Sequence, residues 1–206
     1  MLRYDLENGA AYEHWARGNR TEWPWRDHIL ALDLMYNALD RLLLHSTQWN
    51  YTATNRNDAR IGDGWNQEDF SIYSVDQATS LSDPWSGGRA LQGCVRPRPY
   101  AVQGEVLSMR FNRAARNFTC TIRTPDVLAV GPPEAVGSVF YVPLLQFPDG
   151  FDVAIDGDPG AIVLQDEPGQ RLVVAASRTR ATLKVVVTSR GAQAPTSLKA
   201  MARSWL

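Results

Sequence analysis

Residues 182–188 read Thr-Leu-Lys-Val-Val-Val-Thr, and this stretch decides how the second half of the chain folds. Its apolar residues Leu183, Val185 and Val187 alternate with Lys184 and Val186, which is typical of a strand that buries one face. Upstream lie further short segments, separated by Gly, Pro and Asp turns at spacings of about ten residues, and this pattern predicts an antiparallel β-sandwich. The predicted strands are Glu105–Asn112, Asn117–Arg123, Ser138–Leu145, Gly150–Ile155, Ala161–Leu164, Arg171–Ala176 and Thr182–Thr188.

The first half of the chain has a different period. Across Trp25–His45 the apolar residues recur at steps of three and four, which predicts an amphipathic helix of about 20 residues. The β-branched and aromatic segment Ser46–Thr52 predicts a short strand, and a second helix is expected to begin near residue 86 and to end at Gln92. Between them, the polar segment Asn55–Phe70 predicts a long loop, and loops of that length in compact domains are usually functional or disordered.

Length and composition limit the function classes. The chain has 206 residues, of which 44% are hydrophobic and 21% charged, as in a globular protein. The formal net charge of -1 gives no basic excess for binding nucleic acid, and no apolar stretch is long enough to span a membrane. The N-terminus has no apolar core of the signal-peptide type, and two cysteines are too few for a disulfide scaffold. A cytoplasmic location is therefore the default expectation.

One group of aromatic, amide and acidic residues has the chemistry of a sugar subsite. It comprises residues 48–52 (QWNYT) and residues 62–71 (GDGWNQEDFS). An indole ring can stack on the apolar face of a sugar, while amides and carboxylates bind its hydroxyls. The alternative is that the tryptophans anchor a core and the acids are solvated. The predicted substrate-binding residues are Trp49, Asn50, Asp63, Trp65, Asn66, Glu68 and Asp69.

The order of these motifs resembles the C-terminal end of glycoside hydrolase family 5, in the branch of endoglycoceramidases and glucosylceramide hydrolases. The resemblance implies that residues 1–98 are the C-terminal remnant of a (β/α)8 barrel and that residues 99–206 are a β-sandwich domain, which is an α+β fold overall. A complete barrel takes about 250 residues, so this chain has no room for one beside the sandwich. The motifs that carry the resemblance are YDLENGAAYEHW (4–15), WNYTATNRND (49–58), GDGWNQEDFSIYS (62–74), WSGGRAL (85–91) and VRPRPYAVQG (95–104).

The resemblance also implies a reaction. Enzymes of this kind hydrolyse glycosidic bonds with retention, using two glutamates about 5–5.5 Å apart. In the family both glutamates lie upstream of the motifs matched here, and residues 1–3 (MLR) stand where the family has its Gly-Glu-Phe-Gly nucleophile motif. We therefore expect the C-terminal portion of a retaining hydrolase that acts on glucosylceramide or an oligosaccharyl-ceramide, without catalytic residues of its own and inactive alone.

Two alternatives stay open at this point. Asp63 together with Glu68 or Asp69 would make a carboxylate pair within the loop itself, because the spacing does not forbid it. The second alternative is a non-catalytic β-sandwich module that binds carbohydrate, lipid or protein.

No cofactor and no metal site are expected, because the three histidines do not have the spacing of metal ligands. Glycolipid or carbohydrate is expected as a partner only if the missing part of the barrel is supplied, and neither nucleic acid nor a transmembrane segment is expected. Without barrel strands to cover it, the apolar stripe of the helix at 25–45 predicts self-association or a complex with a barrel-containing chain.

Three arginines have predicted roles. Arg89 follows two glycines and is expected to pair with a carboxylate or to cap a helix. Arg96 and Arg98 alternate with prolines and are expected to connect the two halves of the chain rather than to bind anions.

Overall fold

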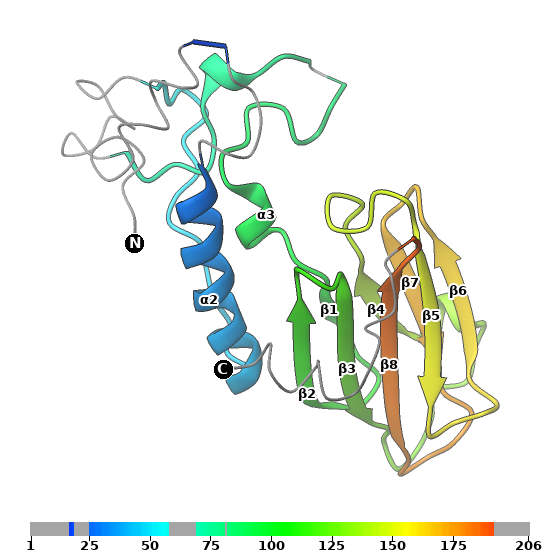
Figure 1. The fold of residues 1–206 in the computed structure, drawn as a ribbon. Coiled ribbons are helices and arrows are strands. Elements are labelled where there is room, and N and C mark those ends of the chain that lie inside the picture. Colours follow the sequence, from blue (N-terminus) through cyan, green and yellow to red (C-terminus); the bar gives the residue numbers. More distant parts are fainter. Residues whose placement is uncertain (1–16, 19–24, 58–68, 81, 192–206) are drawn as a thin grey trace. The chain divides into compact units, whose positions relative to one another are not determined.

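The structure is a computed structural model that describes residues 17–18, 25–57, 69–80 and 82–191. The chain divides into two compact units. The first contains residues up to 39 together with 45–94, and the second contains residues 40–44 together with those from 95 onward. Figure 1 traces both units along the sequence.

The first unit is built on helix α2, Arg26–Leu42. This confirms the predicted helix, although it ends earlier than expected because Leu43 has a left-handed backbone with φ of 51°. The buried face of α2 packs on the chain near Ala90, and the resulting small apolar cluster consists of Trp25, Ile29, Leu32 and Ala90. The unit also contains the 3-10 turn η2, Val75–Gln77.

The second predicted helix is displaced along the sequence. Helix α3 spans Leu91–Cys94, so Gly93 lies inside it although the predicted helix ends at Gln92. Gly93 is buried against α2, where a Cβ atom would lie 2.7 Å from the Cβ of Leu32 and 2.8 Å from the carbonyl oxygen of Ile29. The glycine is therefore needed for close approach of two helices, a role that its local helix-breaking tendency does not reveal.

The second unit is a sandwich of two antiparallel sheets, as predicted, and with α2 it makes the chain an α+β protein (Figure 1). One sheet has the order β1-β4-β7-β6 and the other β2-β3-β8-β5. The strands are β1 (Arg98–Ala101), β2 (Glu105–Asn112), β3 (Asn117–Arg123), β4 (Ser138–Tyr141), β5 (Phe151–Asp156), β6 (Ile162–Asp166), β7 (Arg171–Ala175) and β8 (Thr182–Ser189).

The sandwich core follows from the alternation seen in the sequence. On β8 the side chains of Leu183, Val185 and Val187 are buried, and β3 alternates in the same way opposite them. Phenylalanines from several strands and turns complete this core; they are Phe111, Phe118, Phe140, Phe147 and Phe151.

Some predicted boundaries in this unit are wrong. The strand expected at Ser138–Leu145 ends at Tyr141, because Pro143 follows and begins a turn in which its carbonyl accepts from the backbone N–H of Gln146. Strand β1 and the short helix α4, Pro133–Val136, were not predicted. Pro99 fits in β1 because this strand is at the edge of its sheet, where one row of backbone groups has no neighbouring strand to bond.

Candidate functional site

Trp49 lies in an irregular segment rather than in a strand. The prediction of a strand over Ser46–Thr52 is wrong: the backbone there makes two hydrogen bonds with residues 70–72, at 3.4 and 3.0 Å, and no regular ladder. β-Propensity stabilises a strand only where a neighbouring strand pairs with it. The peptide bond between Trp49 and Asn50 is cis, and 53% of the Trp49 surface is exposed. The indole is therefore accessible to a ligand in this unit.

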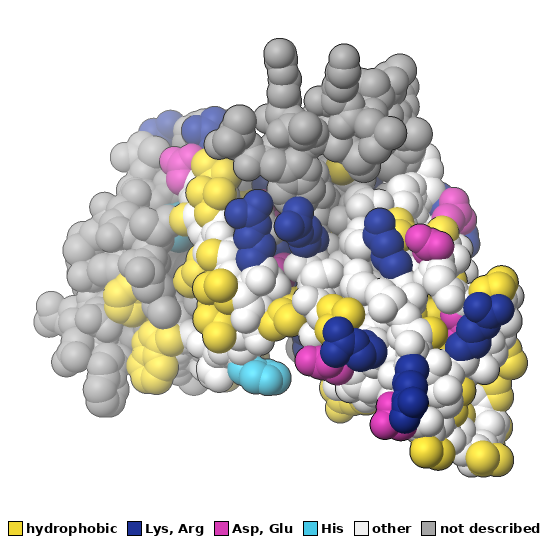
Figure 2. Space-filling model, turned by 90° about the horizontal axis from the view of Figure 1, so that it is seen from below, with side chains coloured by type: hydrophobic (Ala, Val, Ile, Leu, Met, Phe, Trp, Pro, Cys, Tyr) yellow, Lys and Arg dark blue, Asp and Glu magenta, His cyan; other side chains and the backbone are white. Residues whose placement is uncertain are grey.

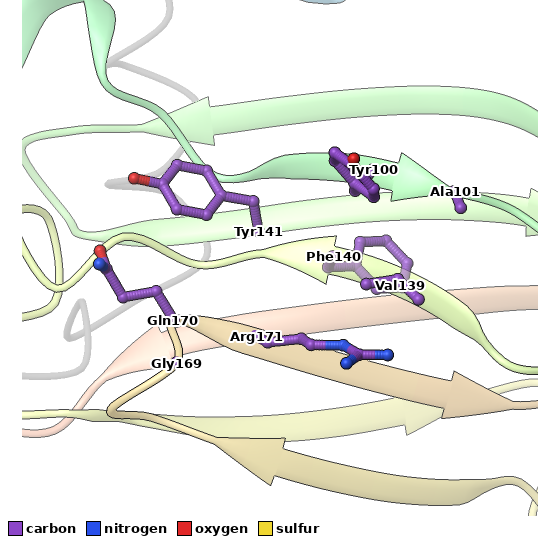
Figure 3. Close-up of a pocket in the computed structure, with 8 residues that line it drawn as sticks. All are labelled: Tyr100, Ala101, Val139, Phe140, Tyr141, Gly169, Gln170 and Arg171. Carbon is purple, nitrogen blue, oxygen red and sulfur yellow. The ribbon is translucent and has the colours of Figure 1, made fainter. Parts of the chain in front are cut away.

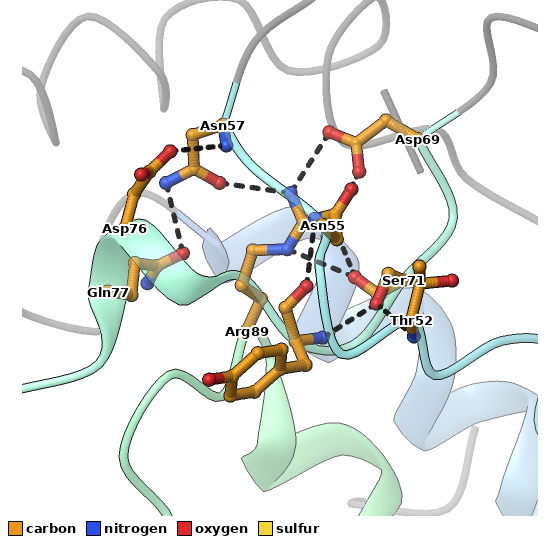
Figure 4. A network of polar contacts seen from close by, with 9 residues as sticks. Thr52, Asn55, Asn57, Asp69, Ser71, Asp76, Gln77 and Arg89 are labelled. Atoms are coloured by element: carbon orange, nitrogen blue, oxygen red, sulfur yellow. Dashed lines mark hydrogen bonds and ion pairs between the residues drawn. The ribbon is translucent and has the colours of Figure 1, made fainter. Parts of the chain in front are cut away.

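A buried ion pair holds the chain around Trp49. Arg89 and Asp69 are both fully buried, and the guanidinium donates to both carboxylate oxygens, with Nη1 2.9 Å from Oδ2 (Figure 4). The carbonyl oxygen of Ser71 accepts two further bonds from Arg89, one of them 3.0 Å from Nε. A bidentate arginine–carboxylate pair fixes both partners in one geometry. The end of the long loop is thus anchored from inside the unit.

The same network reaches the segment that follows Trp49. The Ser71 hydroxyl accepts the backbone N–H of Thr52 at 3.0 Å, and the Asn55 side chain donates to the carbonyl of Tyr73 at 2.8 Å. Arg89 also donates to the side-chain oxygen of Asn57 at 3.1 Å. Figure 4 shows these side chains converging from the segments at 52–57, 69–77 and 89. The backbone on both sides of the predicted subsite is therefore positioned by polar contacts.

The cation at the centre of the network also contacts an aromatic ring. The Arg89 guanidinium carbon lies 5.8 Å from the centre of the Trp25 ring, at the start of α2. The ring of Tyr73 lies close to the backbone at Gly87. This approach requires a glycine, because a Cβ atom there would lie 2.3 Å from the Tyr73 ring. Tyr73 in turn packs on Tyr51, with 5.3 Å between ring centres.

The predicted subsite residues are only partly placed by the structure. Trp49 is exposed and Asn50 half-buried, whereas Asp69 is fully buried with its carboxylate bonded to Arg89. This geometry gives Asp69 a scaffold position rather than a place at the surface, where a sugar hydroxyl would reach it. The other candidates lie outside the described residues; they are Asp63, Trp65, Asn66 and Glu68.

Sequence reasoning found one partner of this network and missed the rest. The expectation that Arg89 pairs with a carboxylate is confirmed, but the sequence did not identify Asp69 as that carboxylate. Ser71 and Asn57 carried no separate signal, because serine and asparagine in a polar loop are ordinary surface residues. Within the described ranges, no group of three or more His, Cys, Asp or Glu side chains is arranged to hold a metal ion.

The family comparison concerns mainly the second unit. Residues 96–187 match the model of the glycoside hydrolase family 5 C-terminal domain. The sandwich is a family 5 C-terminal domain. This confirms the resemblance read from the sequence, including its glucosylceramidase-like branch.

Two curated relatives are fungal glucosylceramidases. The chain is 35% identical over 129 residues to the glucosylceramidase of Cryptococcus neoformans var. grubii and 33% identical over 128 residues to that of Rhizopus delemar. These alignments cover 58% and 56% of the present chain but only 17% of each relative. The chain thus corresponds to a small share of the length of these enzymes.

Solved structures with the same fold include two glycosidases. Sterylglucosidase 1 of Cryptococcus neoformans superposes with a TM-score of 0.74 at 24% identity, over 92% of this chain and 28% of that one. Endo-glycoceramidase II of Rhodococcus sp. superposes with a TM-score of 0.50 at 18% identity, over 79% of this chain and 30% of that one. At these identities the likeness describes the fold.

Proposed function

We propose that this chain is the C-terminal portion of a retaining glycoside hydrolase that cleaves the β-glycosidic bond of a glycosphingolipid, glucosylceramide or an oligosaccharyl-ceramide. The observation that carries the proposal is the 35% identity to a fungal glucosylceramidase over 129 residues, together with the family 5 C-terminal domain. Among the residues that the structure describes, no helix is long and apolar enough to cross a membrane.

Trp49 is proposed as the floor of the subsite for the cleaved sugar. Its exposed indole has the flat apolar surface that the ring C–H groups of glucose require, and Asn50 follows it with an amide for hydroxyl contacts. The Arg89–Asp69 pair holds the backbone on which these residues lie. Asp63, Trp65, Asn66 and Glu68 complete the proposed set from the loop outside the described residues.

The catalytic acid/base and nucleophile are proposed to lie outside this chain. Residues 25–39, 45–57, 69–80 and 82–94, which make up the described part of the first unit beyond residues 17–18, contain no glutamate. Retaining hydrolysis needs two carboxyl groups about 5–5.5 Å apart, and Asp69 is already bonded to Arg89. Residues 1–206 by themselves are therefore proposed to be inactive.

A barrel-bearing segment or a second copy of this chain is proposed as the partner. Helix α2 leaves several large apolar side chains exposed, and Figure 2 shows hydrophobic side chains at the surface of the described residues. Each such residue gains about 1.5–3 kcal/mol on full burial, which favours association. The exposed residues of α2 are Leu30, Leu34, Met35 and Leu42. Light scattering over a dilution series tests this, and a monomer at all concentrations in the absence of other chains contradicts self-association.

The catalytic proposal is tested by comparing two proteins on glucosylceramide. Residues 1–206 alone are expected to give no turnover, and the same residues joined to the proposed barrel-bearing segment, or co-expressed with it, are expected to hydrolyse the lipid. In the joined protein Trp49→Ala should lower kcat/KM by about a hundredfold, because misplacing the sugar disrupts its alignment with the catalytic groups. Tyr51→Ala, another exposed aromatic nearby, is the matched control. Turnover by residues 1–206 alone, or full activity of Trp49→Ala, would refute the proposal.

A further inference from the structure

The sandwich carries a pocket far in sequence from Trp49. It has a volume of about 420 Å³, which lies in the range of small-molecule sites. Its walls come from β1, β4 and the β6–β7 turn with the start of β7, as Figure 3 shows. The lining residues are Tyr100, Ala101, Val139, Phe140, Tyr141, Gly169, Gln170 and Arg171.

A row of three side chains crosses this face of the sheet. In the strand register Arg98 of β1 lies opposite Tyr141 of β4, and Tyr141 lies opposite Arg171 of β7. Directly opposed residues of antiparallel strands project from the same face with Cβ atoms about 4.5–5.5 Å apart. The guanidinium carbon of Arg98 lies 5.6 Å from the centre of the Tyr141 ring. The Arg98 guanidinium therefore lies against the phenol ring of Tyr141, while the side chain of Arg171 extends in the opposite direction along the pocket (Figure 3).

The arginines of the sandwich fall into two groups, those that pair with an acid and those that do not. Arg123, Arg180 and Arg190 each form an ion pair with an acid, at 3.1, 2.7 and 2.6 Å. Within residues 95–191, neither Arg98 nor Arg171 has a carboxylate at ion-pair distance. A guanidinium group without a paired carboxylate is available to donate hydrogen bonds to an anion.

The acid nearest to the row in register is bonded elsewhere. Asp166 of β6 lies opposite Arg171, but its carboxylate accepts the backbone N–H of Gly169 at 3.0 Å inside the β6–β7 turn. Burial raises the pKa of Tyr141, while the charge of Arg98 lowers it. The phenol is therefore neutral near pH 7 and adds no negative charge beside the arginines.

An exposed aromatic ring completes the pocket. The register of β1 shifts between Pro99 and Ala101, so that Tyr100 is the extra residue of a bulge. Bulges re-aim side chains, and 74% of Tyr100 is exposed although it lines the pocket. Figure 3 shows its ring on the same side of the sheet as Tyr141 and Arg171. A ring or apolar chain lying on Tyr100 would bury a surface that water now covers.

We propose that this pocket binds an organic anion, in which a phosphate, sulfate or carboxylate group is attached to a ring-shaped or apolar body. The anionic group accepts hydrogen bonds from Arg171, which lines the pocket, and the body lies on Tyr100 and the apolar floor at Val139. Arg98, which lies outside the lining, adds positive charge next to Tyr141. This role differs from the sequence expectation that Arg98 connects the two halves. Arg96 behaves otherwise, since it is buried and bonds to Asp40 at 2.8 Å.

The proposal is tested on the full chain of 206 residues with three probes. The probes are phenyl phosphate, vesicles of phosphatidylcholine with and without phosphatidylglycerol, and glucose as the uncharged comparison. Saturable binding of phenyl phosphate identifies a soluble organic phosphate as sufficient, and binding to the anionic vesicles alone identifies the lipid headgroup. Binding of neither anionic probe, or binding of glucose with equal affinity, overturns the proposal.

Variants separate the pocket from general surface charge. Arg171→Gln should weaken binding by about tenfold or more, because it removes hydrogen bonds between charged groups, and Arg98→Gln should weaken it less, because this residue contributes charge from outside the lining. Tyr100→Ser should also weaken it by losing the stacked body. The matched control is Lys184→Gln, which makes the same charge change on β8 of the other sheet. The mutated side chains of β1 and β7 are exposed, so melting temperatures should stay unchanged. Equal loss in the control variant would overturn the assignment to this pocket.

Discussion

Asp69→Asn should selectively unfold the first unit. In the native protein both side chains are fully buried. The substitution therefore leaves the Arg89 guanidinium buried without a carboxylate partner. Removing one partner of a buried ion pair costs about 3–5 kcal/mol. The apolar cluster of this unit is small, with Trp25, Ile29 and Ala90 buried among the described residues, so little hydrophobic burial is available to offset the loss. For a unit of this size, such a loss lowers the melting temperature by about 12 °C or more.

Tryptophan fluorescence can follow this unit separately. Six of the seven tryptophans lie within residues 1–94 and none lies within residues 95–204. Circular dichroism in the far ultraviolet then reports the strands of the sandwich. The control is Asp27→Asn, which breaks an exposed pair with Arg26 and should cost at most about 1 kcal/mol. Equal shifts of both variants, or a sandwich transition that moves with Asp69→Asn as far as the fluorescence transition, would refute this reasoning.

Three further perturbations test other contacts. Gly93→Ala should destabilise the first unit by about 1–3 kcal/mol in the same fluorescence assay, because the new Cβ atom would lie 2.7 Å from the Cβ of Leu32 on α2. An unchanged midpoint of the unfolding transition would mean that α2 and α3 move apart without cost. Burial would raise the pKa of Asp158, but its hydrogen bonds, led by the one from the Ser177 side chain, outweigh this effect and hold the pKa below its usual value of 3.8. Ionised Asp158 therefore contributes stability above pH 3.8, and this contribution is lost as the pH falls through the lower pKa of the folded state. Denaturant titrations should show Asp158→Ala losing about 2–3 kcal/mol at neutral pH and much less in acid, and a pH-independent difference would contradict this linkage. Burial raises the pKa of Cys120 to about 12, so thiol labelling of the native protein at mildly alkaline pH should modify half-buried Cys94 first. Equal labelling rates of the two cysteines would show that the sandwich opens readily.

The sandwich was predictable because its signals are local and repeated. The bounds of β2 and β3 agree with the sequence prediction at both ends, since both strands lie between clear turns and β3 alternates buried and half-buried residues. Strand β1 was missed for the opposite reason. Its residues Arg98–Ala101 include a proline and a bulge, and they form a strand only by pairing with β4, which lies about 40 residues further along.

The first unit was harder to predict because its contacts are specified by loops. The helix α2 has a periodic apolar face, and it was found. The Trp49 segment has strand-like composition, yet its backbone bonds to residues 70–72 instead of to a regular neighbour. No local pattern indicates that Asp69, twenty residues before Arg89, is its buried partner rather than a solvated acid beside Glu68.

The two units consequently depend on different forces. The sandwich buries a continuous cluster of phenylalanines and aliphatic residues, and such a core tolerates substitutions that conserve volume. The described part of the first unit has few buried apolar residues and a fully buried polar network, which is directional and loses its geometry when one member is removed. The sequence around residues 52–57, 69–77 and 89 should therefore tolerate conservative substitutions less well than the sandwich core does, even though its residues are mostly polar.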